Sequence, residues 1–172
     1  MGKTSKSGLG VGTGSSPQGS LSQVGVDSKV KELTKKHMID QLTKAGVKFN
    51  PNDVLFVTKD RTGQLVWLET GNKGVGLTHI KERHLSDFVS KHGISKENIV
   101  GHLDSIITTG RLEYSRITMR NGKQGYERLY NKNGQYYLLS ATGTNGFLVT
   151  AYPLDEKVAN NLIRRYKKWV KK

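Results

Sequence analysis

The chain has 172 residues, enough for one domain with a substantial core. Its 28 Lys and Arg residues outnumber 14 Asp and Glu residues, and a net charge of +14 favours polyanionic partners, nucleic acid first and an acidic protein second. Because the chain has no cysteine, disulfides and thiolate metal sites are excluded. No apolar run approaches the roughly 20 residues of a membrane span.

The N-terminal segment, residues 1–27, is rich in Gly and Ser, which supply 13 of its 27 positions. Such a composition cannot bury enough apolar surface to offset chain entropy, so we expect a flexible leader. The leader suggests that the chain is the C-terminal module of a longer protein. Residues 28–172 are expected to form the folded domain, which begins with a helix over 28–46.

Two short extended runs follow, 54–60 and 64–70. The three residues between them end in glycine, which predicts a hairpin. Apolar spacing then predicts a helix from Thr78 to about His92 and another from Lys96 to Thr109, stopped by Gly110.

The apolar period changes after Gly110. Four extended runs are predicted at 111–119, 125–131, 135–143 and 147–154. Asn-Gly pairs at 121–122, 133–134 and 145–146 separate them, and Asn-Gly is the strongest short hairpin signal. A basic amphipathic helix closes the chain. The expected fold is therefore α+β, with N-terminal helices followed by a four-stranded antiparallel meander and a C-terminal helix.

The stretch GNKGVGLTHIKERH at 71–84 places a glycine-rich loop before the helix that starts near Thr78. His84 falls on the apolar stripe of that helix, which favours a packing role. His79 lies off the stripe on the face of Arg83, in a first turn whose amides and dipole attract anions. We interpret His79 as a group that meets phosphate, against the alternative of a solvated surface histidine.

A metal site is not expected. His79 and His84 are five residues apart, about 140° around a helix, whereas paired helical ligands are four apart. The carboxylates are scattered singly along the chain, so no acidic clamp of a two-metal nuclease is visible.

The last predicted strand, FLVTAYPL, offers two hydroxyl groups. Strict alternation turns Phe147, Val149 and Ala151 toward the core and places Thr150 and Tyr152 together on the other face.

The run GYERLYN offers a second candidate surface. Tyr126, Arg128 and Tyr130 share one face and predict an aromatic, basic platform on which RNA bases stack, extended by Arg116. The alternative is ordinary cross-strand pairing of Tyr and Arg side chains.

Two of these stretches carry a resemblance. The segment GLTHIKERH at 76–84, followed by a meander ending in NGFLVTAYP at 145–153, resembles bacterial toxin nucleases of the BECR superfamily, which includes barnase, EndoU and tRNA-cutting colicins. The TAYP at 150–153 is similar to the Thr-x-Tyr-Pro element near the end of EndoU-type ribonucleases. The likeness covers residues 54–155.

The resemblance implies a metal-independent, histidine-based endoribonuclease that needs no cofactor. His79, Thr150 and Tyr152 match the family positions. The second histidine is assigned to His84, with His92 or His102 as alternatives. The family lysine has Arg128 or Lys81 in its place. The implied RNA-binding residues are Arg83, Lys81, Tyr126, Tyr130 and Arg116.

In such an enzyme the ribose 2′-hydroxyl attacks the adjacent phosphate, and the products carry 2′,3′-cyclic phosphate and 5′-hydroxyl ends. The resemblance further implies a toxin module of a contact-dependent or secreted bacterial protein. It would be delivered from the cell surface or by secretion, act on RNA in the target-cell cytoplasm with tRNA favoured, and be blocked by an acidic immunity protein. We expect a monomer when the module is free.

Two other functions remain open from the sequence. A non-catalytic RNA-binding module would share the charge and the tyrosines, without needing His79, Thr150 and Tyr152 together. A metal-dependent DNase toxin would share the basic surface and should contain a carboxylate cluster.

Overall fold

The computed structural model describes residues 29–30, 32–142 and 145–170. The predicted leader, residues 1–27, lies outside them. Helical residues 32–44 come first in the long described range. The elements after them are β1 (Val54–Lys59), β2 (Leu65–Glu69), α3 (Gly76–His92), α4 (Ile99–Thr109), β3 (Arg111–Arg120), β4 (Lys123–Lys132), β5 (Gln135–Thr142), β6 (Phe147–Leu154) and α5 (Glu156–Val170).

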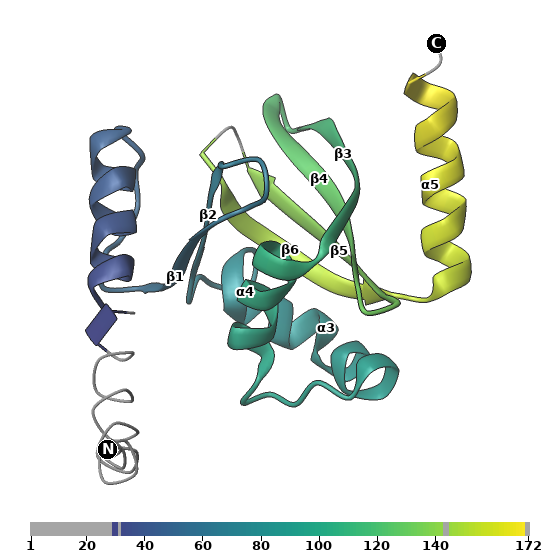
Figure 1. Ribbon diagram of the computed structural model, residues 1–172, viewed down its shortest axis with the longest axis horizontal. Helices are drawn as coiled ribbons and strands as arrows, with labels where there is room; N and C mark the ends of the chain where they lie inside the picture. Colours follow the sequence, from purple (N-terminus) through teal and green to yellow (C-terminus); the bar gives the residue numbers. More distant parts are fainter. Residues whose placement is uncertain (1–28, 31, 143–144, 171–172) are drawn as a thin grey trace, which may run out of the picture.

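One six-stranded sheet joins all the strands in the order β1-β2-β6-β5-β4-β3 (Figure 1). Neighbouring strands are antiparallel except β2 and β6, which pair in parallel. The predicted four-stranded antiparallel meander is therefore wrong as a description of the sheet. Helices also stand at both ends of the described chain, and the β1–β2 hairpin separates the first helix from α3 and α4.

The parallel contact between β2 and β6 depends on Trp67. Its backbone N donates to Gly146 O at 3.0 Å, and its indole Nε1 donates to Asn145 O at 2.9 Å. The rings of Trp67 and Phe147 pack with centroids 4.7 Å apart. These contacts link residues 78 to 80 positions apart in the sequence, so local alternation and turn signals could not reveal them.

The predicted Asn-Gly turns are confirmed at both ends of β4. Asn121 and Gly122 have φ of 51° and 73°, and Asn133 and Gly134 have φ of 54° and 86°. Two successive residues with positive φ are what a two-residue hairpin turn requires, because that twist matches the strands it joins. These turns fix the β3–β4 and β4–β5 registers.

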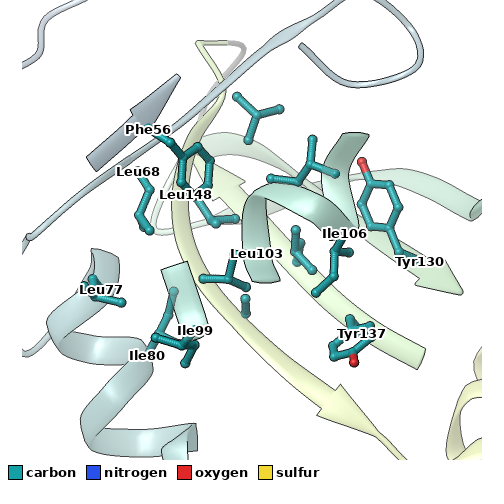
Figure 2. Close-up of a cluster of buried hydrophobic side chains, with 14 of the residues drawn as sticks. Phe56, Leu68, Leu77, Ile80, Ile99, Leu103, Ile106, Tyr130, Tyr137 and Leu148 are labelled. Carbon is teal, nitrogen blue, oxygen red and sulfur yellow. The ribbon is translucent and has the colours of Figure 1, made fainter. Parts of the chain in front are cut away.

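The two faces of the sheet are covered by different helices. α3 and α4 pack on one face, where the main core contains fully buried Ile80, Phe88 and Leu103 (Figure 2). On β5, Tyr137 and Leu139 point into this core. α5 packs on the opposite face through a smaller cluster that includes Tyr114, Leu129, Leu138 and Ala159. Residues 32–44 cover the β1–β2 hairpin through Leu42, and stand at the opposite end of the molecule from α5 (Figure 1).

None of the helices formed by the described residues is both long and apolar enough to cross a bilayer.

Candidate functional site

A cleft of about 490 Å³ lies between the glycine-rich loop before α3 and the strands β3 to β6. It opens on the face of the sheet to which α5 is bound, because Tyr152 belongs both to the cleft wall and to the α5 cluster. Its polar and glycine lining includes Gly74, Thr118, Glu127, Ser140, Thr150 and Tyr152.

Thr150 and Tyr152 reach the cleft from β6, as the sequence predicts for the two hydroxyls. Val149 is buried as predicted, at 9% exposed, but it does not share a face with Ala151. Ser140 pairs with Thr150 and the next residue of β5 pairs with Leu148, so Val149 is the extra residue of a bulge. The bulge interrupts strict alternation, which places Leu148 with Ala151 in the core and Val149 on the cleft wall.

Thr150 presents a polar atom that the fold leaves without a hydrogen bond. Its Oγ1 is buried and has no partner among the described residues. A buried hydroxyl without a partner is costly, and such groups in a cleft are typically positioned for a ligand or water.

The glycine-rich loop before α3 is a tight backbone turn. Gly71 and Gly76 have φ of 69° and 79°, and a Cβ added at Gly71 would lie 2.1 Å from Val75 O. Asn72 N donates to Val75 O, Gly74 N donates to Asn72 Oδ1, and Val75 N donates to Asn72 O. These amides therefore donate within the loop and are not available to a phosphate. The role of the loop is to set where α3 begins.

His79 is held by this loop. Its Nδ1 lies 2.9 Å from Lys73 O. A carbonyl oxygen can only accept, so Nδ1 carries the proton and Nε2 is the unprotonated nitrogen of the neutral ring. The loop thus selects the tautomer of His79 as well as its position.

His84 stands between His79 and Tyr152. Its ring centroid is 5.9 Å from that of His79 and 4.8 Å from that of Tyr152. Five-residue spacing does not keep the two imidazoles apart, contrary to the expectation from helical angles. Burial lowers the pKa of His84, and the neighbouring His79 lowers it further, whereas Asp87 raises it. The His84–Tyr152 contact is thus one of the contacts between α3 and β6.

Glu127 is the cleft residue that the sequence analysis missed. The Tyr114 hydroxyl donates to its Oε1 at 2.8 Å, Arg116 Nε donates to Oε1 at 3.0 Å, and Arg116 Nη2 donates to Oε2 at 3.3 Å. The Glu127 side chain is only 15% exposed. Alternation in GYERLYN places the Glu127 side chain on the other face of the strand from Tyr126. This alternation was the sequence signal that could have identified Glu127 as a cleft residue.

Two tyrosines beside the cleft are kept protonated. Burial raises the pKa of Tyr152, and the charge of Glu127 raises it further. Burial and the hydrogen bond to Glu127 raise the pKa of Tyr114. At neutral pH the Tyr152 hydroxyl therefore keeps its proton as a donor, while the proton of Tyr114 is already donated to Glu127.

The predicted Tyr–Arg platform of β4 faces the other way. Arg128 is 7% exposed and forms a buried ion pair with Asp60, while its Nη2 donates to Gln64 Oε1 at 2.6 Å. Its guanidinium lies 4.0 Å from the ring centre of Tyr126. Tyr126 is 9% and Tyr130 2% exposed, so the structure does not bring these three residues to the cleft. Arg116, in contrast, lies beside the cleft through Glu127.

The remaining sequence candidates are distributed around α3. Arg83 is exposed and Lys81 half-buried on that helix. His92 and His102, the alternatives for the second histidine, lie together against Tyr137, with ring centroids 4.7 Å and 5.2 Å from it. Of the histidines considered, His79 and His84 are the pair associated with the cleft residue Tyr152.

Within the part of the chain that the structure describes, no group of three or more His, Asp or Glu side chains is placed to hold a metal ion. In comparisons with known proteins, no family model matches the chain and no curated protein matches it.

Proposed function

We propose that this protein is a metal-independent endoribonuclease whose centre is the cleft beside α3. The observation that carries the proposal is the packing of His84 on Tyr152, with ring centroids 4.8 Å apart. His84 thereby touches Tyr152, a residue of the cleft wall that also holds Thr150 and Glu127, and the ring of His79 follows at 5.9 Å from His84. Two imidazoles and an ion pair that adjoin a cleft with two hydroxyls supply the kinds of group that phosphodiester transesterification needs.

The proton transfers are assigned to the histidines. His79 holds its proton on Nδ1, so Nε2 accepts the proton of the ribose 2′-hydroxyl as the 2′-oxygen attacks phosphorus. The bond from phosphorus to the 5′-oxygen breaks, and that oxygen takes a proton from protonated His84. Because burial and His79 lower the pKa of His84, this protonated form is the minor one at neutral pH, and cleavage should increase as the pH falls toward that pKa. The products are a 2′,3′-cyclic phosphate and a 5′-hydroxyl. Exchange with water then removes the added proton from His79 and returns one to His84.

Residues of the strands are assigned to stabilise the negative charge on the phosphate. Thr150 and Tyr152 donate hydrogen bonds from rigid positions on β6 to the non-bridging oxygens. Arg116 supplies the cation, and Glu127 fixes its guanidinium through hydrogen bonds to both carboxylate oxygens. Fixed donors are already oriented before the reaction begins, so little reorganisation is required.

The wider role in the proposal is that of a toxin module of a contact-dependent or secreted bacterial protein. A net charge of +14 supports a polyanionic substrate, and tRNA is the favoured one. The same charge supports an acidic immunity protein as the partner that protects the producing cell. The module would act in the cytoplasm of the target cell.

The test is incubation of the purified protein with total tRNA and, separately, plasmid DNA, each with and without EDTA. We expect RNA cleavage that survives EDTA, with fragments ending in 2′,3′-cyclic phosphate. RNA binding without cleavage would identify a binding module instead. Cleavage of DNA that disappears in EDTA and returns with Mg²⁺ would identify a metal-dependent DNase.

A further inference from the structure

α5 is docked beside the proposed catalytic cleft. The ring of Tyr166 stacks on Tyr114 with centroids 5.0 Å apart, and the Tyr114 hydroxyl donates to Glu127 of the cleft wall. Leu162 and Ile163 pack in the same cluster as Tyr152. The helix therefore extends the cleft wall beyond the residues assigned to chemistry.

The outer surface of α5 is strongly basic. Its exposed cations over 156–168 are Lys157, Arg164, Arg165, Lys167 and Lys168, and its exposed carboxylate is Glu156. The proposed chemistry uses none of these cations, and α5 packs through its apolar residues. Arg164 donates to Asn161 Oδ1 within the helix.

Part of this charge lines a hollow along the helix. A depression of about 640 Å³ is bounded by Lys157, Asn160, Ile163, Arg164 and Lys167, with Glu156 at its start. The polar members recur at three- and four-residue intervals, so they form one stripe down a single side of α5. We call Lys157, Asn160, Arg164 and Lys167 the α5 stripe.

We infer that the α5 stripe binds the sugar–phosphate backbone of the RNA strand outside the bond that is cut, which makes polymeric RNA rather than a dinucleotide the preferred substrate. The inference rests on the proposed function. At 1.5 Å per residue the stripe is about 15 Å long, enough to face more than one phosphate. A row of cations separated by an amide suits a linear polyanion, whose charges are also spaced in a row.

Continuity favours RNA over an acidic protein as the occupant. Ile163 lies in the hollow and also in the cluster with Tyr152, whose ring meets His84. The α5 stripe therefore belongs to a helix packed on the same face of the sheet as the cleft, where a strand that extends beyond the cleft could reach it. Such contacts position the strand without reading its bases.

The test compares two variants that each remove three positive charges. The first neutralises the α5 stripe with Lys157→Gln, Arg164→Gln and Lys167→Gln. The matched control carries Lys36→Gln, Lys44→Gln and Lys48→Gln, exposed lysines at the end of the molecule opposite α5 (Figure 1). Cleavage is measured on an RNA dinucleotide and on a tRNA transcript over a range of salt concentrations, after melting curves show that both variants fold.

We expect the stripe variant to raise KM for the transcript on the order of 10-fold, with kcat and dinucleotide cleavage unchanged. The slope of log(kcat/KM) against log salt should become shallower by about 2, because each contact to a single-strand phosphate contributes about 0.7. The control should stay close to the wild type. An equal effect in both variants, or an unchanged KM in the stripe variant, would overturn the inference. Normal RNA kinetics combined with lost binding to an acidic protein would also overturn it and make the stripe a protein interface.

Failure of the proposed function itself gives a different result, since the wild type would then cut neither substrate. Binding is therefore measured separately by fluorescence anisotropy with a 2′-O-methyl RNA, which lacks the attacking hydroxyl. Weakened binding by the stripe variant alone would support the stripe even without cleavage, and equal binding by all three proteins would reject it.

Discussion

Two histidine–tyrosine clusters lie along α3, one at each end. At the N-terminal end, His79 and His84 meet Tyr152 of β6. At the C-terminal end, His92 meets Tyr137 of β5, which also contacts a histidine of α4. The residue types are the same, yet the tyrosines stand on opposite faces of the sheet, because Tyr152 lines the cleft and Tyr137 belongs to the main core.

In the second cluster the tyrosine hydroxyl is satisfied within the fold, although His92 Nδ1 is buried without a partner among the described residues. The Tyr137 hydroxyl donates to Gln135 Oε1 at 3.2 Å and lies 2.8 Å from His102 Nε2, so it accepts from that nitrogen. Tyr137 is fully buried, and burial raises its pKa to about 12. Its donor and acceptor positions are occupied within the fold, which makes this cluster a structural contact between α3, α4 and β5.

The comparison teaches that an imidazole beside a phenol is not a site until the surroundings are considered. At the first cluster Thr150 leaves a buried hydroxyl without a partner among the described residues, and Glu127 is held by two donors. A substrate can supply the partner that Thr150 lacks. The predictions below test whether chemistry and stability divide between the clusters in this way.

The largest effect is expected for His79→Ala. Removing a general base lowers the rate by about 10²- to 10⁴-fold. The melting temperature should stay within a few degrees, because His79 is held mainly by the Lys73 carbonyl at the surface. Cleavage kinetics and thermal melting measure both properties. His37→Ala, an exposed histidine on the first helix, is the matched control and should retain full activity. Near wild-type cleavage by His79→Ala would remove His79 from the mechanism.

The sharpest test of the comparison deletes one hydroxyl from each cluster. Tyr137→Phe leaves His102 Nε2 without its acceptor and should cost about 1–3 kcal/mol of unfolding free energy, with cleavage retained at low temperature. Tyr152→Phe keeps the ring that packs on His84 and should lose mainly activity, by roughly 10-fold or more.

Each variant serves as the control for the other, because both replace a tyrosine by phenylalanine and so remove one hydroxyl. Denaturant unfolding and RNA cleavage are measured on both proteins. If Tyr137→Phe lost activity without losing stability, or Tyr152→Phe did the reverse, the division between the clusters would be wrong.

Local signals in the sequence predict the strands and turns well. The Asn-Gly pairs at 121–122 and 133–134 form the turns expected of them, and the helix of GLTHIKERH begins where its glycine loop ends. These features depend on a few adjacent residues, because positive φ and apolar period are local properties. Thr150 and Tyr152 were placed on a common face by the same kind of argument.

Long-range pairings account for what the sequence could not predict. The parallel contact of Trp67 with Phe147 enlarges the sheet, and the ion pair of Arg128 with Asp60 occupies a guanidinium that would otherwise suit phosphate. Neither partner is visible from its own neighbourhood in the chain. The bulge at Val149 is a smaller case, since one extra residue reverses the alternation on which the core assignment rested.

The smallest expected effect is the pH dependence of stability at the second cluster. Burial lowers the pKa of both His92 and His102, and nearby positive groups lower it further, Lys91 for the first and Lys132 for the second, whereas Asp155 raises that of His92. His92 Nδ1 is buried without a partner among the described residues, so a proton placed there has no acceptor.

A lowered pKa in the folded state means that the unfolded chain binds protons first as pH falls. The stabilisation is complete above the unfolded value of about 6.5 and is lost as the pH drops from there through the lowered folded values. Because both rings remain partly exposed, the total loss should stay below about 1 kcal/mol. We expect unfolding free energy measured between pH 7 and pH 5 to fall with a shallower slope in His92→Gln/His102→Gln than in the wild type. His37→Gln, which removes an imidazole elsewhere, should keep the wild-type slope. An unchanged slope in the double variant would show that these two histidines do not couple protonation to folding, and His84, whose pKa burial also lowers, would then be the remaining candidate for that coupling.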